Sequence, residues 1–319
     1  MNSILSKAKL GAEPGGRPPA AVEITPEGVL AAARHSGPNS GKAGQGSQAP
    51  VYAYQPLPAG AVLPGIGEPN LRAPEAVAAA IRATLDQVSP RTRAVTLVVP
   101  DPAVRVFVLD FDALPAKAEE ANPVLKFRLR KMVPFDVEHA GVSYQVLIEN
   151  KSECKVLVGV LPGPVLAEYE AAVRAAGYEP GAVLPSSLAT LAAIDSMEAV
   201  LIANLSPVAL TTCISNGQDL LLYRTLDLPE DPTLRLDEVR RGVAVAAAYY
   251  EDKLGGRPTR LYYAGDAALP EAGAQGFARW LEDPELAVID LAPTPETGAA
   301  TPLGAASIAA VTGALAGVH

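Results

Sequence analysis

The sequence predicts an α/β protein built from two similar halves, and three observations support this fold class. Short runs rich in β-branched residues, such as "AVTLVVP" from Ala94 to Pro100, alternate with longer stretches whose apolar residues recur every three or four positions. The same order of elements occurs twice: a hairpin, a third strand, a helix, another strand and a packing helix. Finally, 49% of the 319 residues are hydrophobic, which is enough to bury a large core.

The first half begins with residues 1–19, which are rich in Gly and Pro and are expected to form a flexible tail. The stretch from Ala20 to Gly37 indicates two short strands around a turn at Pro26-Glu27-Gly28. Residues 35–49 have the composition of a loop between strands. A third strand follows, and a helix that begins near Pro74 carries a single apolar stripe, as expected of a helix that lies on a sheet.

A strand-helix-strand-strand module is predicted after the strand that ends at Pro100. Its strands are "VRVFVLDF", "VSYQVLIEN" and "CKVLVGVLP", and its helix spans Ala116 to Met132. The next segment is an amphipathic helix that ends at Gly177, because glycine readily adopts the left-handed conformation common after a helix.

The second half repeats the pattern of the first. Three strands, "AVLIANLS", "VALTTCIS" and "DLLLYRTLDL", occur in succession, and Asn216-Gly217 is typical of a hairpin turn. A long helix then ends at Gly255-Gly256 and precedes the strand "TRLYYAGD". The closing apolar segment, Leu303 to Val318, has 16 residues, fewer than the roughly 20 that a bilayer requires, so we expect a buried helix there.

Composition excludes several classes of protein. A net charge of -9 argues against a nucleic-acid binder, which needs a basic surface. Cys154 and Cys213 lie far apart, so neither a disulfide framework nor a zinc site is predicted, and a reducing compartment is expected. His35, His139 and His319 lack metal-ligand spacing. Ser186 and Ser187 suggest a helix N-cap and not a nucleophile, because no G-x-S-x-G motif surrounds them.

Four segments resemble the PilM family of type IV pilus inner-membrane platform proteins, a branch of the actin-like ATPase superfamily related to FtsA of cell division. They are "PLPAGAV", "VTLVVPDPAVRVFVLDF", "LRKMVPFDVEHAGVSYQVL" and "GYEPGAVLPSSLATLAA". The resemblance implies a duplicated actin-like (ribonuclease H-like) bilobal fold. Its first half would be residues 20–194, with the inserted module at 102–162, and its second half residues 195–319.

The resemblance also indicates where a nucleotide would bind. In the superfamily each half offers an Asp-x-Gly hairpin to the phosphates, and a late Gly-Gly element packs against adenosine. The matching residues in this chain are Glu23 and Thr25, Asn204 and Ser206, and Gly265 and Asp266.

Both hairpins also carry a proline, which departs from the superfamily pattern. Pro26 and Pro207 each remove a backbone donor, at a cost of about 2 to 6 kcal/mol together, or roughly 30-fold to 10⁴-fold in affinity. We therefore expect a degenerate site with no cofactor, or with weakly bound ATP and Mg²⁺, and no catalytic residue.

The resemblance further implies a partner. The family binds the short cytoplasmic N-terminal peptide of a membrane-anchored protein, PilN, in a groove between the inserted module and the core of the first half. Arg105, Phe107, Pro134 and Phe135 are candidate walls of that groove, although phenylalanines such as Phe107 and Phe135 are more often core residues.

The segment "KFRLRKMVPF" places Lys126, Arg128 and Arg130 close together on a predicted helix. Two interpretations stay open for it. The cations can belong to a solvated helix face, or they can form a basic patch that meets an acidic partner or anionic lipid headgroups.

Three functions are consistent with these observations. The leading hypothesis is a non-catalytic adaptor of type IV pilus assembly that is cytoplasmic, peripheral to the inner membrane and in contact with other platform and motor proteins. The second is an active actin-like ATPase or kinase, for which an Asp-x-Gly loop is expected and is absent from the sequence. The third is the cytoplasmic domain of a type II secretion platform protein, which normally continues into a transmembrane helix.

Overall fold

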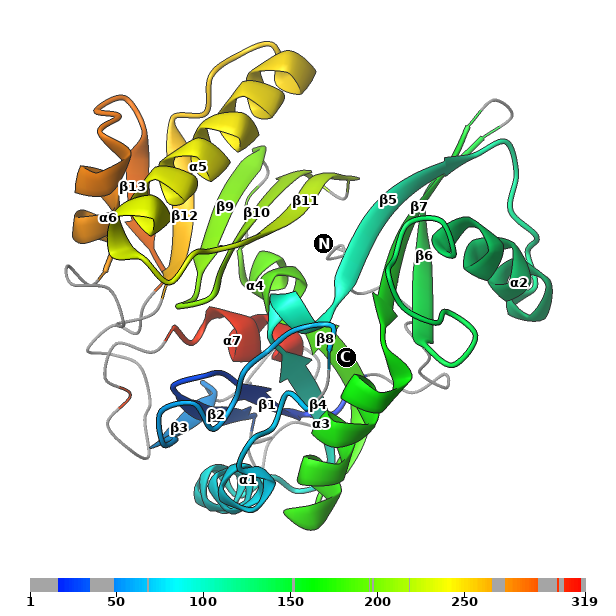
Figure 1. The fold of residues 1–319 in the computed structure, drawn as a ribbon, viewed down its shortest axis with the longest axis vertical. Helices are drawn as coiled ribbons and strands as arrows, with labels where there is room; N and C mark the ends of the chain where they lie inside the picture. Colours follow the sequence, from blue (N-terminus) through cyan, green and yellow to red (C-terminus); the bar gives the residue numbers. More distant parts are fainter. Residues whose placement is uncertain are drawn as a thin grey trace, which may run out of the picture.

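The structure, a computed structural model, contains two five-stranded sheets and one three-stranded sheet in its described part (Figure 1). The described residues are 17–34, 49–67, 69–150, 153–194, 196, 198–217, 219–265, 273–291, 303 and 307–316. Most of the predicted tail (1–16), most of the predicted loop (35–48), and Asp266, His35 and His319 therefore lie outside the described residues.

The first five-stranded sheet has a hairpin at one side and parallel strands at the other. In spatial order its strands are β3 (Val51–Pro56), β2 (Gly28–Ala33), β1 (Ala20–Ile24), β4 (Ala94–Val99) and β8 (Glu179–Pro185). β1, β2 and β3 pair antiparallel, whereas β4 pairs parallel with both β1 and β8. β1, β2 and β4 are buried on both faces, which explains their nearly continuous apolar runs.

The second five-stranded sheet repeats this topology strand for strand. Its order is β11 (Asp219–Asp227), β10 (Ala209–Asn216), β9 (Val200–Leu205), β12 (Arg260–Gly265) and β13 (Ala287–Asp290). Again the first three strands pair antiparallel, and β12 pairs parallel with β9 and β13. The same order and the same directions in both sheets confirm the predicted duplicated bilobal fold.

Helices cover both sheets. α1 (Pro74–Val88) and α3 (Gly163–Ala175) pack on the first sheet, and α5 (Pro232–Leu254) and α6 (Ala274–Leu281) pack on the second. Among the described helices none is long and apolar enough to cross a membrane.

The inserted module follows a short 3-10 turn, η1 (Asp101–Ala103), in the strand-helix-strand-strand order that the sequence predicts. β5 (Arg105–Phe111), α2 (Ala118–Leu129), β6 (Gly141–Glu149) and β7 (Cys154–Leu161) form it, and the antiparallel sheet has the order β5-β7-β6. α2 covers one face of this sheet, where Leu125 and Leu129 pack with Val156 and Val158.

Two short helices, α4 (Ser186–Ala193) and α7 (Ala309–Leu315), pack against each other next to the first sheet. α7 comes last in the chain, yet its Val311 and Leu315 pack on the first-half sheet with Val98. A Cβ atom at Gly313 would lie 1.8 Å from the carbonyl oxygen of Ala189, so this close crossing requires glycine. The closing helix thus ties the end of the second half onto the first.

Candidate functional site

A cavity of about 430 Å³ lies where the hairpin turns of the two halves meet. The structure brings five of the six residues that match the nucleotide motifs together in its lining: Glu23, Thr25, Asn204, Ser206 and Gly265. The sixth, Asp266, lies outside the described residues. We call this space the inter-half cavity.

The first hairpin turn satisfies its own backbone donors. The N–H group of Thr25 donates to the carbonyl oxygen of Gly28 at 2.9 Å, and the N–H group of Gly28 donates to the Thr25 hydroxyl at 3.2 Å. Pro26, between them, has no N–H group. Three of the four positions of this turn therefore have no uncommitted donor for a phosphate oxygen.

The second hairpin turn has the same arrangement. The N–H group of Ser206 donates to the carbonyl oxygen of Ala209 at 2.9 Å, and the N–H group of Ala209 donates to the Ser206 hydroxyl at 3.1 Å. Pro207 takes the place that Pro26 has in the first turn. Thr25 and Ser206 thus close the two turns in the same way, which a sequence comparison with an Asp-x-Gly motif does not reveal.

Asp101 forms a buried polar cluster on one side of the inter-half cavity. Its carboxylate, in a residue only 5% exposed, accepts from the N–H group of Ser187 at 3.0 Å and from the Ser187 hydroxyl at 2.5 Å. It also accepts from the Tyr223 hydroxyl at 2.7 Å and the Asn204 amide at 3.2 Å. Burial, together with the nearby Asp101 charge, raises the pKa of Tyr223 well above its ordinary value, so Tyr223 stays a neutral donor. The cluster joins η1 and α4 of the first half to β9 and β11 of the second.

The serines at the start of α4 do not act as the predicted N-cap. The N-cap position is Pro185, and the Ser186 hydroxyl instead donates to Glu23 at 2.7 Å. The amide of Asn204, which occupies the matching position in the second hairpin, donates to the same hydroxyl at 3.2 Å. The N-cap prediction was wrong. The Ser186 and Ser187 hydroxyls donate to the carboxylates of Glu23 and Asp101, and a hydrogen bond to a charged acceptor is stronger than the bond that an N-cap hydroxyl accepts from a backbone N–H group.

The charges around the inter-half cavity are negative. Glu23, Glu27 and Asp101 line it, and its described lining contains no lysine or arginine. A polyphosphate placed there would meet these carboxylates and no cation among the described lining residues, and the energetic cost of like charges grows as solvent is excluded. Sequence reasoning missed Asp101, whose only signal was an acidic residue directly after a buried strand.

A second cavity, of about 290 Å³, lies between the inserted module and the core of the first half. We call it the module groove. Ser143, Gln145 and Gly159 line it from the module, and Leu166 and Val183 line it from α3 and β8. Since β8 is the last strand of its sheet, one side of its backbone has no neighbouring strand in that sheet. Glu170, paired with Arg174 at 2.8 Å, is the one charged residue in the described lining.

The residues predicted as groove walls do not line the module groove. Phe107 and Phe135 pack in the module core under α2, and Arg105 donates to the carbonyl oxygens of Pro102 and Val104. Pro134 is exposed. Alternate residues of a strand point to opposite faces of a sheet. In β7, Leu157 and the odd-numbered residues near it face the module groove, whereas the even-numbered residues face α2. A partner-binding role of these four residues stays a prediction.

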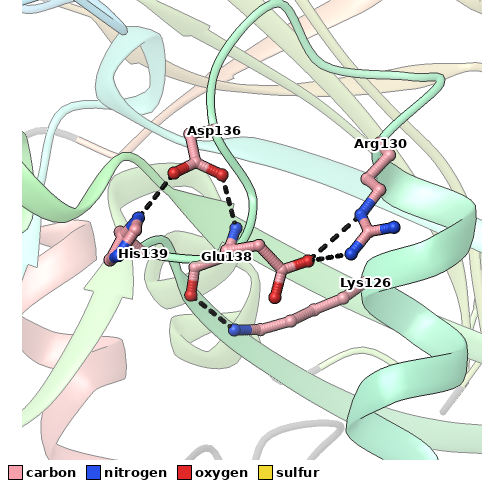
Figure 2. Close-up of polar contacts among 5 residues, drawn as sticks. All are labelled: Lys126, Arg130, Asp136, Glu138 and His139. Carbon is pink, nitrogen blue, oxygen red and sulfur yellow. Dashed lines mark hydrogen bonds and ion pairs between the residues drawn. The ribbon is translucent and has the colours of Figure 1, made fainter.

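Two of the three predicted cations of α2 are held by the loop that follows the helix (Figure 2). Lys126 donates to the carbonyl oxygen of Glu138 at 2.8 Å, and Arg130 pairs with the Glu138 carboxylate, which lowers the pKa of Glu138. Asp136 accepts a hydrogen bond from the N–H group of Glu138 at 2.9 Å, and its carboxylate lies 2.5 Å from Nδ1 of His139. The hydrogen bond from His139 is the main reason that the pKa of Asp136 is lowered. Arg128 is exposed.

Comparison with known proteins gives a strong structural similarity. No model of a known protein family matches the sequence, and no curated protein matches it significantly. The structure is similar to PilM in a solved "PilM-PilN type IV pilus biogenesis complex", with a TM-score of 0.71 and 17% identity over 94% of this chain and 98% of that chain.

Two further similarities are weaker. The cytoplasmic domain of EpsL, an inner membrane component of the type II secretion system of Vibrio cholerae, matches with a TM-score of 0.46 and 15% identity over 79% of this chain and 83% of that chain. A Bacteroides thetaiotaomicron protein with an actin-like ATPase fold matches with a TM-score of 0.46 and 11% identity over 91% of this chain and 93% of that chain. The duplicated sheets and the similarity to PilM together establish that this chain has the bilobal actin-like fold with an inserted three-stranded module.

Proposed function

We propose that this chain is a PilM-like, non-catalytic adaptor of type IV pilus assembly that binds the N-terminal cytoplasmic peptide of a membrane-anchored, PilN-like protein. The module groove is the observation that carries this proposal, because it combines an apolar lining with the open edge of β8. The similarity of the fold to PilM, solved in a PilM-PilN complex, supports the choice of partner.

An extended peptide suits the module groove. Its backbone can pair with the outer edge of β8, as in other cases in which a peptide adds a strand to a sheet. Its side chains would then alternate between Leu166 and Val183 on one side and Ser143 and Gln145 on the other.

The proposal assigns no catalytic role and no strongly bound cofactor to the inter-half cavity. Both hairpin turns close on themselves, and the cavity carries carboxylates and no described cation. Weak binding of ATP and Mg²⁺ is the most that this arrangement supports. In the proposed role the chain is cytoplasmic and peripheral to the inner membrane, held there by its partner, and can contact further platform and motor proteins.

Gly159 offers a sharp test. A Cβ atom at Gly159 meets nothing within 4 Å, so a larger side chain enters the module groove without a clash in the fold. Gly159→Ile should leave the protein folded, because β-branched residues suit a central strand, and should abolish binding of a fluorescent peptide with the sequence of the partner's N-terminus. Fluorescence anisotropy measures the binding, and thermal unfolding checks the fold.

Gly256→Ile is the matched control. A Cβ atom at Gly256 also meets nothing within 4 Å, but this residue follows α5 in the second half. The control should bind the peptide as the unaltered chain does. Peptide binding that survives Gly159→Ile would refute the groove assignment, and micromolar, Mg²⁺-dependent ATP binding in a parallel calorimetric titration would refute the non-catalytic one.

A further inference from the structure

The solvent face of α2 and the turn after it carries an unusual concentration of exposed apolar side chains. Phe127 is 65% exposed, Met132 39% and Val124 37%. Only seven large apolar side chains are exposed in the whole described part of the chain, and three of them lie within these nine residues. The buried face of the helix, formed by Ala121, Leu125 and Leu129, is fully used by the module core, so it does not account for them.

The same nine residues carry a concentrated positive charge. Residues 124–132 contain Lys126, Arg128, Arg130 and Lys131 and no acidic residue, in a chain whose net charge is -9. Lys126 and Arg130 are committed to Glu138, but no salt bridge to Arg128 or Lys131 occurs within the described residues. Their charge is therefore available to an external anion.

The two kinds of side chain are combined at one point. The Lys131 ammonium lies 6.0 Å from the centre of the Phe127 ring, and Arg128 is the next residue along the helix. An exposed aromatic ring flanked by cations is the arrangement of side chains that binds the interface of an anionic bilayer. There the ring enters the boundary between headgroups and acyl chains, and the cations meet the phosphates.

The shape of this face favours a lipid surface over an acidic protein. Neither the inter-half cavity nor the module groove has an α2 residue in its described lining, and α2 lies on the outer side of the module, away from both five-stranded sheets (Figure 1). A protruding ring can insert into the boundary between headgroups and acyl chains, an apolar environment that a surface of acidic side chains does not offer. We propose that Val124, Phe127, Arg128, Lys131 and Met132 dock this chain onto the anionic surface of a membrane.

This docking is separate from the proposed function. It uses the α2 face of the module sheet, while the module groove opens on the opposite face. It would give the chain a direct contact with the membrane, in addition to any contact through a membrane-anchored partner.

The test is co-sedimentation of the full chain with vesicles of phosphatidylcholine alone or of phosphatidylcholine mixed with phosphatidylglycerol. The unaltered chain should bind the mixed vesicles and not the neutral ones, and binding should weaken as salt is added. The double variant Arg128→Gln, Lys131→Gln should bind about 30-fold more weakly, since two cations are lost from the interface. Phe127→Ser should also weaken binding, and because the side chain is exposed it should not affect folding.

The matched control is the double variant Arg257→Gln, Arg260→Gln, which removes the same charge from exposed residues of the second half. It should bind mixed vesicles as the unaltered chain does. Equal loss in this control would mean that only net charge matters, and would overturn the proposal. A failure of the unaltered chain to bind mixed vesicles would also overturn the proposal. Unchanged vesicle binding by Phe127→Ser, together with displacement of the vesicles by a polyglutamate peptide, would overturn it as well and would indicate an acidic protein partner. Gly159→Ile should bind vesicles normally, so failure of the groove proposal is seen separately.

Discussion

The two halves share their hairpins almost bond for bond, yet they differ at the inserted module. In each half the N–H group of a leucine after the third strand donates to the turn: Leu57 to Glu27 at 2.8 Å and Leu228 to Val208 at 2.9 Å. The first half differs in having the three-stranded module between β4 and α3, and with it the module groove. The two hairpin turns at the junction thus close in the same way, whereas the module groove lies beside the inserted module of the first half.

This difference separates a closed junction from the surface that we propose for peptide binding. At the junction, the polar groups of both halves satisfy one another through Asp101, Asn204 and the serines of α4. At the module, β8 is the last strand of its sheet, and a Cβ atom at Gly159 would meet nothing within 4 Å. Variants at the junction should therefore change stability, and variants in the groove should change binding.

The largest effect at the junction is expected for Asp101→Ala. The substitution leaves the N–H group of Ser187, the amide of Asn204 and the hydroxyl of Tyr223 without their shared acceptor inside the protein. Orphaned buried donors cost roughly 1 to 3 kcal/mol each, so we expect a loss of about 4 kcal/mol in the free energy of unfolding, measured by urea denaturation. A loss below about 1 kcal/mol would show that water reaches the cluster and that the junction is not closed.

Gly313→Ala tests the contact between α4 and α7. The added Cβ atom would lie 1.8 Å from the carbonyl oxygen of Ala189, and a backbone atom cannot move aside as a flexible side chain can. Overpacking of this kind costs about 3 kcal/mol, which urea denaturation would detect. Gly159→Ala is the control and should be neutral or stabilising, since its Cβ atom has open space. Similar stability of the two variants would contradict the close crossing.

The duplicated fold was predicted correctly from the sequence because the patterns that indicate each helix and strand lie within short stretches of the chain. Periodic apolar stripes and β-branched runs depend on neighbouring residues, and the order of elements in each half follows from them. The turns were harder to interpret: Pro26 and Pro207 were visible, but the hydroxyl groups of Thr25 and Ser206 act through three-dimensional hydrogen bonds. The buried cluster was missed because Asp101 meets Tyr223 across 122 residues of chain.

The position of the module groove also could not be predicted from the sequence. Whether Phe107 or Gly159 faces the groove depends on which face of the module sheet α2 covers. Periodicity shows that a strand has two faces and does not show which of them is covered. The packing of α7 on the first half, far from its neighbours in sequence, is a similar long-range result.

Asn204→Asp sharpens the comparison between the two hairpins, because Glu23 already places a carboxylate at the matching position of the first one. The variant exchanges a donor 3.2 Å from the Asp101 carboxylate for a second carboxylate. Like charges in a poorly solvated site repel, so we expect a loss of about 2 kcal/mol at neutral pH, which shrinks as acid protonates the pair. Asn216→Asp, at an exposed end of β10, should have almost no effect. Equal losses in the two variants would argue against a buried negative cluster at the junction.

The smallest effect concerns Tyr178, which ties β8, the strand that borders the groove, to α1. Its hydroxyl donates to Asp86 at 2.8 Å, and burial together with that hydrogen bond raises its pKa to about 12. Because the pKa is higher in the folded state than in the unfolded one, this stabilisation is complete below about pH 10 and is lost as the pH rises toward about 12. Denaturation at several alkaline pH values should show a loss of roughly 1 to 2 kcal/mol in the unaltered chain that Tyr178→Phe lacks. If both chains lose stability equally over that range, β8 is not held by this tyrosine, and the edge that we propose for peptide binding has another support.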